Sequence, residues 1–141
     1  MKIVIISDSH NNLANLKHVM GFAKKIDAQA VIHCGDWNDL KSVDTVFSYK
    51  IPVYGVVGNA DIADNIKDKF NKFLEIKIDN KKIAIIHSIK DLKSNNYDIV
   101  FCGHRHKQQK NGNVVNPGAL ENDINFAVYD TITGKIEFFN D

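Results

Sequence analysis

Asp, His and Asn side chains recur where the apolar, strand-like segments of this chain end. The set comprises Asp8, His10, Asp36, Asn59, Asp61, His87, His104 and His106. A single Asp or His in such a place is most simply a helix cap, a turn residue or a buried structural side chain. Five successive strand ends that carry such residues, most of them beside a small residue, instead favour one shared site, because sites form at the carboxyl edge of parallel sheets.

The residue types of this set favour divalent metal ions. Carboxylate and imidazole ligands suit Zn, Mn, Fe or Ni, and the scarcity of thiols argues against a soft metal site. Two ions about 3.5–4 Å apart can share one carboxylate and one hydroxide, activate that hydroxide and hold a phosphate for in-line attack. The pairs Asp8-x-His10 and His104-x-His106 would each lie on one side of an extended chain. We then expect Arg105 to point away from the ions; the alternative folds it back to a phosphate oxygen.

Short apolar, β-branched runs predict the strands that must position these side chains. They cover residues 2–7, 30–34, 51–57, 73–78, 82–87, 98–102, 114–115, 126–129 and 135–139. Helical spacing of apolar residues predicts a helix from Leu13 to Ile26, capped by Asn11 or Asn12, and a polar helix is expected over residues 39–50. The first half is βαβ-like and the second half is mostly β. This order favours two sheets packed face to face with helices outside over one doubly wound sheet.

Composition limits the class of protein. With 141 residues, 44% hydrophobic and 25% charged, the chain has the size and composition of one soluble domain. Its 18 Lys and Arg against 17 Asp and Glu leave a formal charge of +1, which argues against a dedicated nucleic-acid surface and against an anionic membrane. No apolar run suits a signal peptide or a spanning helix. Cys34 and Cys102 are interpreted as reduced thiols, so the expected location is the cytoplasm.

The motifs, taken in order, resemble those of a known superfamily. Those motifs are Asp8-x-His10, Gly35-Asp36, Gly58-Asn59-x-Asp61, His87 and Gly103-His104-x-His106. The chain resembles the calcineurin-like metallophosphoesterase superfamily, and its short length, with the runs His33-Cys34-Gly35-Asp36 and Asn116-Pro117-Gly118-Ala119, resembles the small YfcE-type phosphodiesterase branch. The resemblance implies an α/β fold, a four-layer α-β-β-α sandwich of two mixed sheets. It also implies a single domain over residues 1–141 without a cap domain, and hence an open site.

The resemblance also implies which residues hold the ions. One ion would be held by Asp8, His10, Asp36 and His106. The other would be held by Asp36, Asn59, His87 and His104, so that Asp36 bridges. The catalytic residues would be Asp36, Asn59, Asp61 and His10, with Asp61 supporting a ligand instead of binding an ion, as outer carboxylates commonly orient an imidazole. The expected cofactors are two divalent metal ions, Mn²⁺ first, with Ni, Fe, Co and Zn as alternatives.

The activity that the resemblance implies is hydrolysis of a small phosphodiester by a hydroxide that bridges the two ions. One alternative is a protein-binding scaffold, since the retromer subunit of this superfamily uses the fold for protein contact; the complete set of seven ligands argues against it. A second is a phosphomonoesterase or nucleotide pyrophosphatase. Larger members carry a His after the Asn that protonates the leaving group, but this chain has Ala60, which weighs against a monoesterase. No nucleic-acid or membrane partner is expected, and a homo-oligomer is left open.

Three further residues have competing interpretations. His33, on a buried strand, is expected to pack in the core in preference to binding a metal. Trp37 either forms a wall of the substrate pocket or covers the edge of the core. His18, within the first helix, is expected at the surface.

Overall fold

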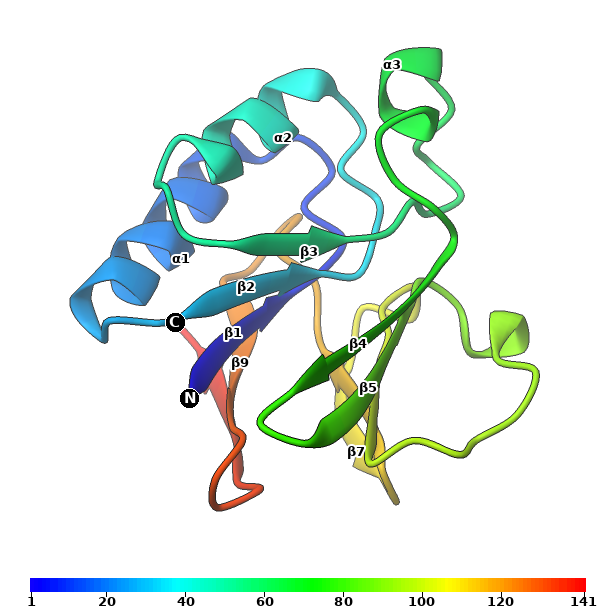
Figure 1. Cartoon of the computed structure of the whole chain (residues 1–141). Helices are drawn as coiled ribbons and strands as arrows, with labels where there is room; N and C mark the ends of the chain where they lie inside the picture. The colour runs from blue at the N-terminus through cyan, green and yellow to red at the C-terminus, as the bar shows by residue number, and fades with distance from the viewer.

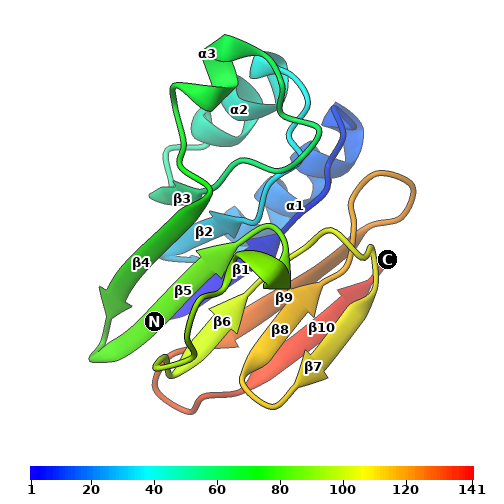
Figure 2. The same ribbon diagram turned by 90° about the vertical axis from the view of Figure 1, so that its right-hand side faces the viewer.

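Two mixed five-stranded sheets pack face to face in the computed structural model, which describes residues 1–141 (Figures 1 and 2). The first sheet contains, in spatial order, β10 (Ile136–Asn140), β9 (Asn125–Asp130), β1 (Lys2–Ile6), β2 (Ala30–His33) and β3 (Val53–Gly55). The second contains β4 (Phe73–Ile78), β5 (Lys81–Ile86), β6 (Ile99–Phe101), β8 (Val114–Pro117) and β7 (Gln108–Asn111). Central strands run parallel in both sheets, and antiparallel strands flank them. The predicted α/β fold, with two mixed sheets packed face to face, is therefore confirmed.

The helices cover the two sheets unequally. Helices α1 (Leu13–Lys25) and α2 (Leu40–Phe47) lie on the outer face of the first sheet (Figure 1), and the short α3 (Asp64–Lys67) follows β3. Asn12 caps α1, as predicted, by accepting the Asn15 N–H through its side chain. The outer face of the second sheet carries only the 3-10 turn η1 (Ile89–Asp91) and a loop that packs Leu92 and Tyr97 on it. None of the helices has the length and hydropathy that a membrane-spanning segment needs.

Alternating side chains of the buried strands divide the core into layers. In β1, Val4 and Ile6 pack with the helices, whereas Ile3 and Ile5 point to the other sheet. Phe101 of β6 meets this second group, so the apolar layer between the sheets is continuous. Each inner strand is therefore buried on both faces, which explains its nearly uninterrupted apolar sequence.

The structure contains three elements that the sequence did not predict: α3, η1 and β7. Strand β7 is entirely polar and lies at the edge of its sheet, so it lacks the apolar alternation on which a prediction rests. The predicted strands over residues 73–78 and 82–87 form the β4–β5 hairpin, whose turn residues Asp79 and Asn80 both have positive φ, as a two-residue hairpin turn of the common type requires.

Candidate metal centre

All eight residues singled out in the sequence lie in loops that directly follow strands. Asp8 and His10 follow β1, Asp36 follows β2, and Asn59 with Asp61 follows β3. From the second sheet, His87 follows β5, and His104 with His106 follows β6. The two sheets therefore contribute facing loops to one place.

Two carboxylates meet three imidazoles at the centre of this place. Asp8 Oδ1 lies 3.3 Å from His106 Nε2 and 3.8 Å from the Nε2 atoms of both His10 and His87. Asp36 Oδ2 lies 3.2 Å from His87 Nε2 and 3.4 Å from His10 Nε2. Candidate ligand atoms lie within 4.8 Å of one another in two groups, Asp8–His10–His106 and Asp8–Asp36–His87. Both carboxylates contact the imidazoles of both expected ligand sets.

Asn59 and His104 lie next to His87. Asn59 Oδ1 is 2.9 Å from His87 Nε2 and 3.2 Å from His104 Nδ1. The structure thus brings the seven expected ligands together, although His104 belongs to neither of the two compact groups.

Hydrogen bonds orient two imidazoles so that their Nε2 atoms face the centre. His87 Nδ1 donates to the Cys34 carbonyl oxygen at 2.8 Å, and His10 Nδ1 donates to Asn38 Oδ1 at 3.0 Å. In the neutral rings Nε2 is therefore the unprotonated nitrogen, the usual arrangement of a metal-binding histidine. The lone pairs of these Nε2 atoms face the same space as the carboxylate oxygens of Asp8 and Asp36 and the carboxamide oxygen of Asn59, and this arrangement favours a cation there.

Each carboxylate is held by one oxygen and presents the other to the imidazoles. Asp8 Oδ2 accepts the His104 N–H at 2.9 Å and the Ser7 hydroxyl at 2.7 Å. Asp36 Oδ1 accepts the Ala60 N–H at 2.8 Å. Rotation of either carboxylate would break these bonds, so Asp8 Oδ1 and Asp36 Oδ2 are fixed toward the centre.

Two buried polar atoms at the centre have no hydrogen-bond partner: Asp8 Oδ1 and His10 Nε2. An unsatisfied buried polar group costs about 1–3 kcal/mol. Both are good ligands of divalent ions of the Mn–Zn series, so a bound ion would satisfy both at once. The residues present therefore fit the metal ions that the sequence predicted.

The backbone of the candidate ligands is strained. Asp8, His10, Asp36, His104 and His106 have φ values of 51°, 42°, 64°, 75° and 54°. The left-handed conformation costs a non-glycine residue on the order of 1–3 kcal/mol, and such residues cluster at functional sites. The expectation that the Asp8-x-His10 and His104-x-His106 segments are extended is therefore wrong. Tight turns, and not strand periodicity, place their side chains.

Glycines allow the loops to approach one another closely. A Cβ atom on Gly103 would collide with the side chains of Ser7 and Asp8, and one on Gly58 would collide with the Asp36 carboxylate. Gly103 is therefore required for the contact between loops of opposite sheets, and Gly58 for the contact between the loops that follow β2 and β3 of the first sheet.

Asp61 accepts hydrogen bonds from backbone N–H groups and does not contact an imidazole. Its Oδ2 accepts the N–H groups of Asp36 and Gly58, each at 2.8 Å, and its Oδ1 accepts the Asn38 N–H at 2.7 Å. Both carboxylate oxygens are thereby occupied. Asp61 is a positioning residue that ties the loops after β2 and β3 together, and the expected contact with a ligand histidine is absent.

The pKa values show how strongly the centre favours positive charge. Burial raises the pKa of Asp8, although hydrogen bonds and nearby imidazoles oppose that rise. Burial would also raise the pKa of Asp36, but hydrogen bonds from His87 and the Ala60 N–H, with the imidazole charges, lower it to about 2. Burial opposes charge on His87, yet the two aspartates raise its pKa above the ordinary value. A divalent ion bound here would take the place of the proton that the charged His87 ring carries.

Glu121, in the loop after β8, was missed by the sequence analysis. Its Oε2 lies 3.8 Å from His106 Nδ1 and 3.9 Å from His10 Nε2. The only signal was its position two residues after the run 116–119, on which part of the family resemblance rests. That run lies beside the centre, since Asn116 Nδ2 donates to the Gly103 carbonyl oxygen.

His33 and Trp37 belong to the core beside the centre. The Gly35 N–H donates to His33 Nδ1 at 3.0 Å, so His33 Nε2 donates to Ser9 Oγ at 2.9 Å. The His33 ring stacks on Trp37 at 3.7 Å, and the Trp37 indole N–H donates to the Val56 carbonyl oxygen. Of the two alternatives for Trp37, the core is therefore the observed one. His18 lies at the surface beside Asp141, as expected.

Burial of His33 predicts that acid destabilises the metal-free protein. Burial lowers its pKa from 6.5 to about 3. The unfolded chain binds the proton first, so this contribution to stability is complete above pH 6.5 and is lost as the pH falls toward 3, by up to about 1.4 kcal/mol per pH unit. Urea unfolding of chelated protein at pH 7 and pH 5 measures the loss. In His33→Gln the loss should be smaller by about 2 kcal/mol. His18→Gln is the surface control, and an unchanged pH dependence in His33→Gln would contradict the prediction.

Comparison with known proteins identifies the family. Residues 1–134 match the family model of the calcineurin-like phosphoesterase superfamily domain. The chain belongs to this superfamily. The resemblance seen in the motifs is thereby confirmed, and a phosphoesterase family fits an Asp/His cluster that could hold divalent metal ions.

This phosphoesterase is similar to a phosphodiesterase in sequence, and it shares its fold with further phosphoesterases and with a sorting protein. Phosphodiesterase MJ0936 of Methanocaldococcus jannaschii is 29% identical in an alignment that covers 84% of this chain and 83% of the relative. The structure of an archaeal phosphodiesterase is 26% identical, with a TM-score of 0.84 and 99% of both chains covered. YfcE, a phosphoesterase from E. coli, shares the fold at 17% identity and a TM-score of 0.76 over 99% and 98% of the two chains. Vacuolar protein sorting 29 of Cryptosporidium parvum also shares the fold, with 21% identity and a TM-score of 0.66 over 99% of this chain and 96% of the other.

Proposed function

We propose that this protein is a phosphodiesterase that depends on two divalent metal ions. The ions would be held by Asp8, His10, Asp36, Asn59, His87, His104 and His106. The observation that carries the proposal is the pair of buried, unpartnered atoms Asp8 Oδ1 and His10 Nε2, which face other metal-ligand atoms at 3.3–3.8 Å. The phosphodiesterase relatives support the choice of a diester substrate.

Two divalent ions bound here would supply a nucleophile at neutral pH and stabilise the charge of an in-line displacement at phosphorus. The protein's part is to hold the ligands. Asp8 and Asp36 together neutralise only half the charge of two such ions, and Asn59 adds a neutral oxygen. The centre therefore keeps positive charge for a phosphodiester anion. Hydrogen bonds to Asp8, Asp36, His10 and His87 fix that arrangement before substrate binds.

The proposed centre is open on one side. His104, His106 and Asn59 are exposed, and Ala60 next to them offers only its N–H, which donates to Asp36. Asp61 is engaged with three backbone N–H groups, so it is not free to protonate a leaving group. Because neither Ala60 nor Asp61 can supply a proton, the site suits substrates whose leaving groups need little protonation.

The absence of an acid at Ala60 predicts a steep dependence on the leaving group. Across a series of aryl diesters, turnover should fall sharply as the pKa of the leaving phenol rises. Ala60→His should reduce that slope by adding a proton donor beside Asn59, an effect worth about 10²–10⁴-fold on the poorest leaving groups where a general acid operates. Ala60→Asn, which adds a polar side chain but no acid, should keep the steep slope. A shallow slope in the unmodified protein would contradict the prediction.

Hydrolysis assays test the proposed function directly. Chelated protein is supplied with Mn²⁺, Ni²⁺, Co²⁺, Fe²⁺ or Zn²⁺, and release of nitrophenolate from bis(4-nitrophenyl) phosphate and from 4-nitrophenyl phosphate is compared. We expect turnover of the diester to exceed that of the monoester, with Mn²⁺ the most effective ion. Faster monoester hydrolysis would contradict the assignment of a diester substrate. Inactivity with every ion would contradict the proposal that the protein is an enzyme.

A protein-binding scaffold is the second candidate, because the sorting protein of Cryptosporidium parvum shares this fold. Fold alone does not distinguish the two functions. Three features favour the enzyme: the seven metal-ligand residues, the strained backbone at five of them and the unpartnered buried atoms. Strain and unpartnered buried atoms destabilise the fold, and a protein-binding scaffold would have no use for them.

A further inference from the structure

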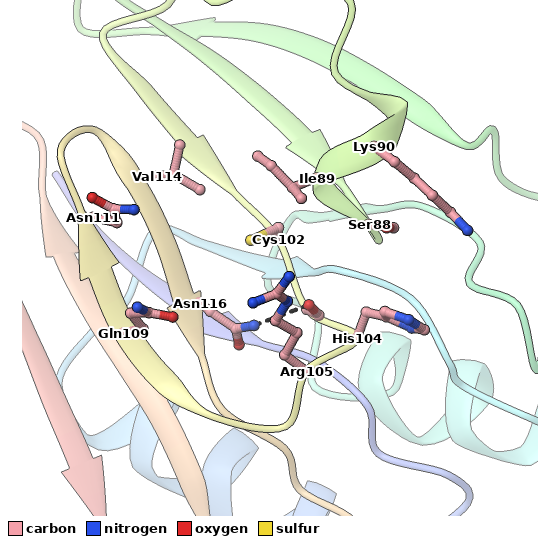
Figure 3. Close-up of a pocket in the computed structure, with 11 residues that line it drawn as sticks. Ser88, Ile89, Lys90, Cys102, His104, Arg105, Gln109, Asn111, Val114 and Asn116 are labelled. Atoms are coloured by element: carbon pink, nitrogen blue, oxygen red, sulfur yellow. Dashed lines mark hydrogen bonds between the residues drawn. The ribbon is translucent and has the colours of Figure 1, made fainter.

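A polar pocket adjoins the candidate metal centre on the outer face of the second sheet (Figure 3). It lies at the ends of β6 and β8, beside η1, where this sheet has no helical cover. Its volume of about 570 Å³ lies within the range of small-molecule sites, about 300–1,000 Å³. Cys102 and Val114 form an apolar base, and Gln109 and Asn111 of β7 line one side.

The pocket and the metal centre share a wall. Gly103 and His104 line the pocket, while His104 Nδ1 lies 3.2 Å from Asn59 Oδ1 in the centre. Asn116 links the two, because it lines the pocket and donates to the Gly103 carbonyl oxygen at 2.9 Å. A compound held at the centre by one phosphate can therefore extend past His104 into the pocket.

The charge of the pocket is positive and unbalanced. Of its eleven lining residues, Lys90 and Arg105 are cationic and none is acidic. Neither cation lies within 4.0 Å of a carboxylate anywhere in the chain. The Arg105 side chain lies between Cys102 and Asn116 and points away from His104 (Figure 3). In a protein with a formal charge of only +1, two unpaired cations at one pocket favour an anion there.

The remaining polar groups of the pocket are of the kinds that bind phosphate. A guanidinium group binds phosphate through two parallel N–H donors, and carboxamide N–H groups add neutral donors. Gln109 and Asn111 make no side-chain hydrogen bond within the protein, so their amides are available to a ligand. Arg105, set between two ligand histidines in the sequence, thus serves the neighbouring pocket.

We infer that this pocket binds a second phosphate group of the substrate, so that the preferred substrates are phosphodiesters carrying a further phosphate. The inference rests on the proposed function, which it narrows. Arg105 is the residue that sets the preference, with Gln109 and Asn111 as neutral donors beside it.

Binding to the manganese-loaded protein tests the inference without turnover. Calorimetry compares thymidine 5′-monophosphate with thymidine 3′,5′-bisphosphate, which share one phosphate and differ by the second. The bisphosphate should bind at least about tenfold more tightly, and Arg105→Gln should reduce the preference to about twofold or less. Lys110→Gln is the matched control. It also removes a positive charge from this part of the surface. The Lys110 side chain does not line the pocket and donates to the Gly112 carbonyl oxygen, so the preference for the bisphosphate should persist.

Equal dissociation constants for the two nucleotides, or binding of neither, would overturn the inference. A preference that survives Arg105→Gln would overturn the role given to that residue. These outcomes differ from failure of the proposed function, which would be seen as absence of nitrophenyl diester hydrolysis with every ion.

Discussion

Asp36→Asn should lower the kcat/KM for a nitrophenyl diester by more than about 100-fold. Changes outside the ligand set alone commonly cost 10–100-fold in metal affinity or activity, and Asp36 contacts both halves of the centre. Its Oδ2 lies 3.4 Å from His10 Nε2 and 3.2 Å from His87 Nε2. A neutral amide would present one weak oxygen where the carboxylate is proposed to bind both cations, so binding of both ions should weaken.

Calorimetric titration with Mn²⁺, run beside the kinetic measurement, separates loss of metal from misfolding. Asp44→Asn makes the same chemical change on the exposed face of α2 and should leave both measurements as in the unmodified protein. Two tightly bound ions and near-normal turnover in Asp36→Asn would contradict the assignment of Asp36 as the bridge.

Removal of metal should lower the melting temperature by several degrees for each ion lost, without unfolding the protein at room temperature. An ion present at a hundred times its dissociation constant adds about 2.7 kcal/mol per site, provided that the unfolded chain does not bind it. For a chain of this length, 1 kcal/mol corresponds to roughly 2–5 °C. The apo-protein should stay folded because the apolar layer between the sheets and the layer under α1 and α2 do not include the ligands.

Melting curves followed by circular dichroism decide this prediction. Chelated protein should melt lower than protein reloaded with Mn²⁺, and reloading should restore activity in parallel. In Asp36→Asn the difference between the two curves should shrink, which ties the stabilisation to the centre. Superimposable curves for chelated and reloaded protein would mean that the residues named here hold no ion.

The strand ends could be predicted because each depends on local signals. Apolar β-branched runs mark strands that are buried on both faces, and Asp, His or Asn after such a run marks the functional edge. Asp8, Asp36 and His87 follow this rule and meet as expected. The way in which they meet could not be predicted, because the left-handed turns at Asp8 and His104 arise from contacts between loops of opposite sheets.

The features missed by the sequence analysis are those that only tertiary contact defines. Strand β7 is polar, yet it completes the pocket by pairing with β8. Glu121 comes close to His10 only because its loop packs against the segment after β1, where the Leu120 N–H donates to the Ser7 carbonyl oxygen. The Arg105 side chain points away from His104 and lines this pocket, which residues far apart in the sequence form together and which no sequence pattern indicates.

Turnover of bis(4-nitrophenyl) phosphate during stepwise addition of Mn²⁺ to chelated protein tests the proposed function most directly. At protein concentrations above the dissociation constants, the rate should rise from near zero and stop rising at two equivalents. A rate that is unaffected by chelation, that saturates with a single ion, or that never rises would contradict a phosphodiesterase with two metal ions.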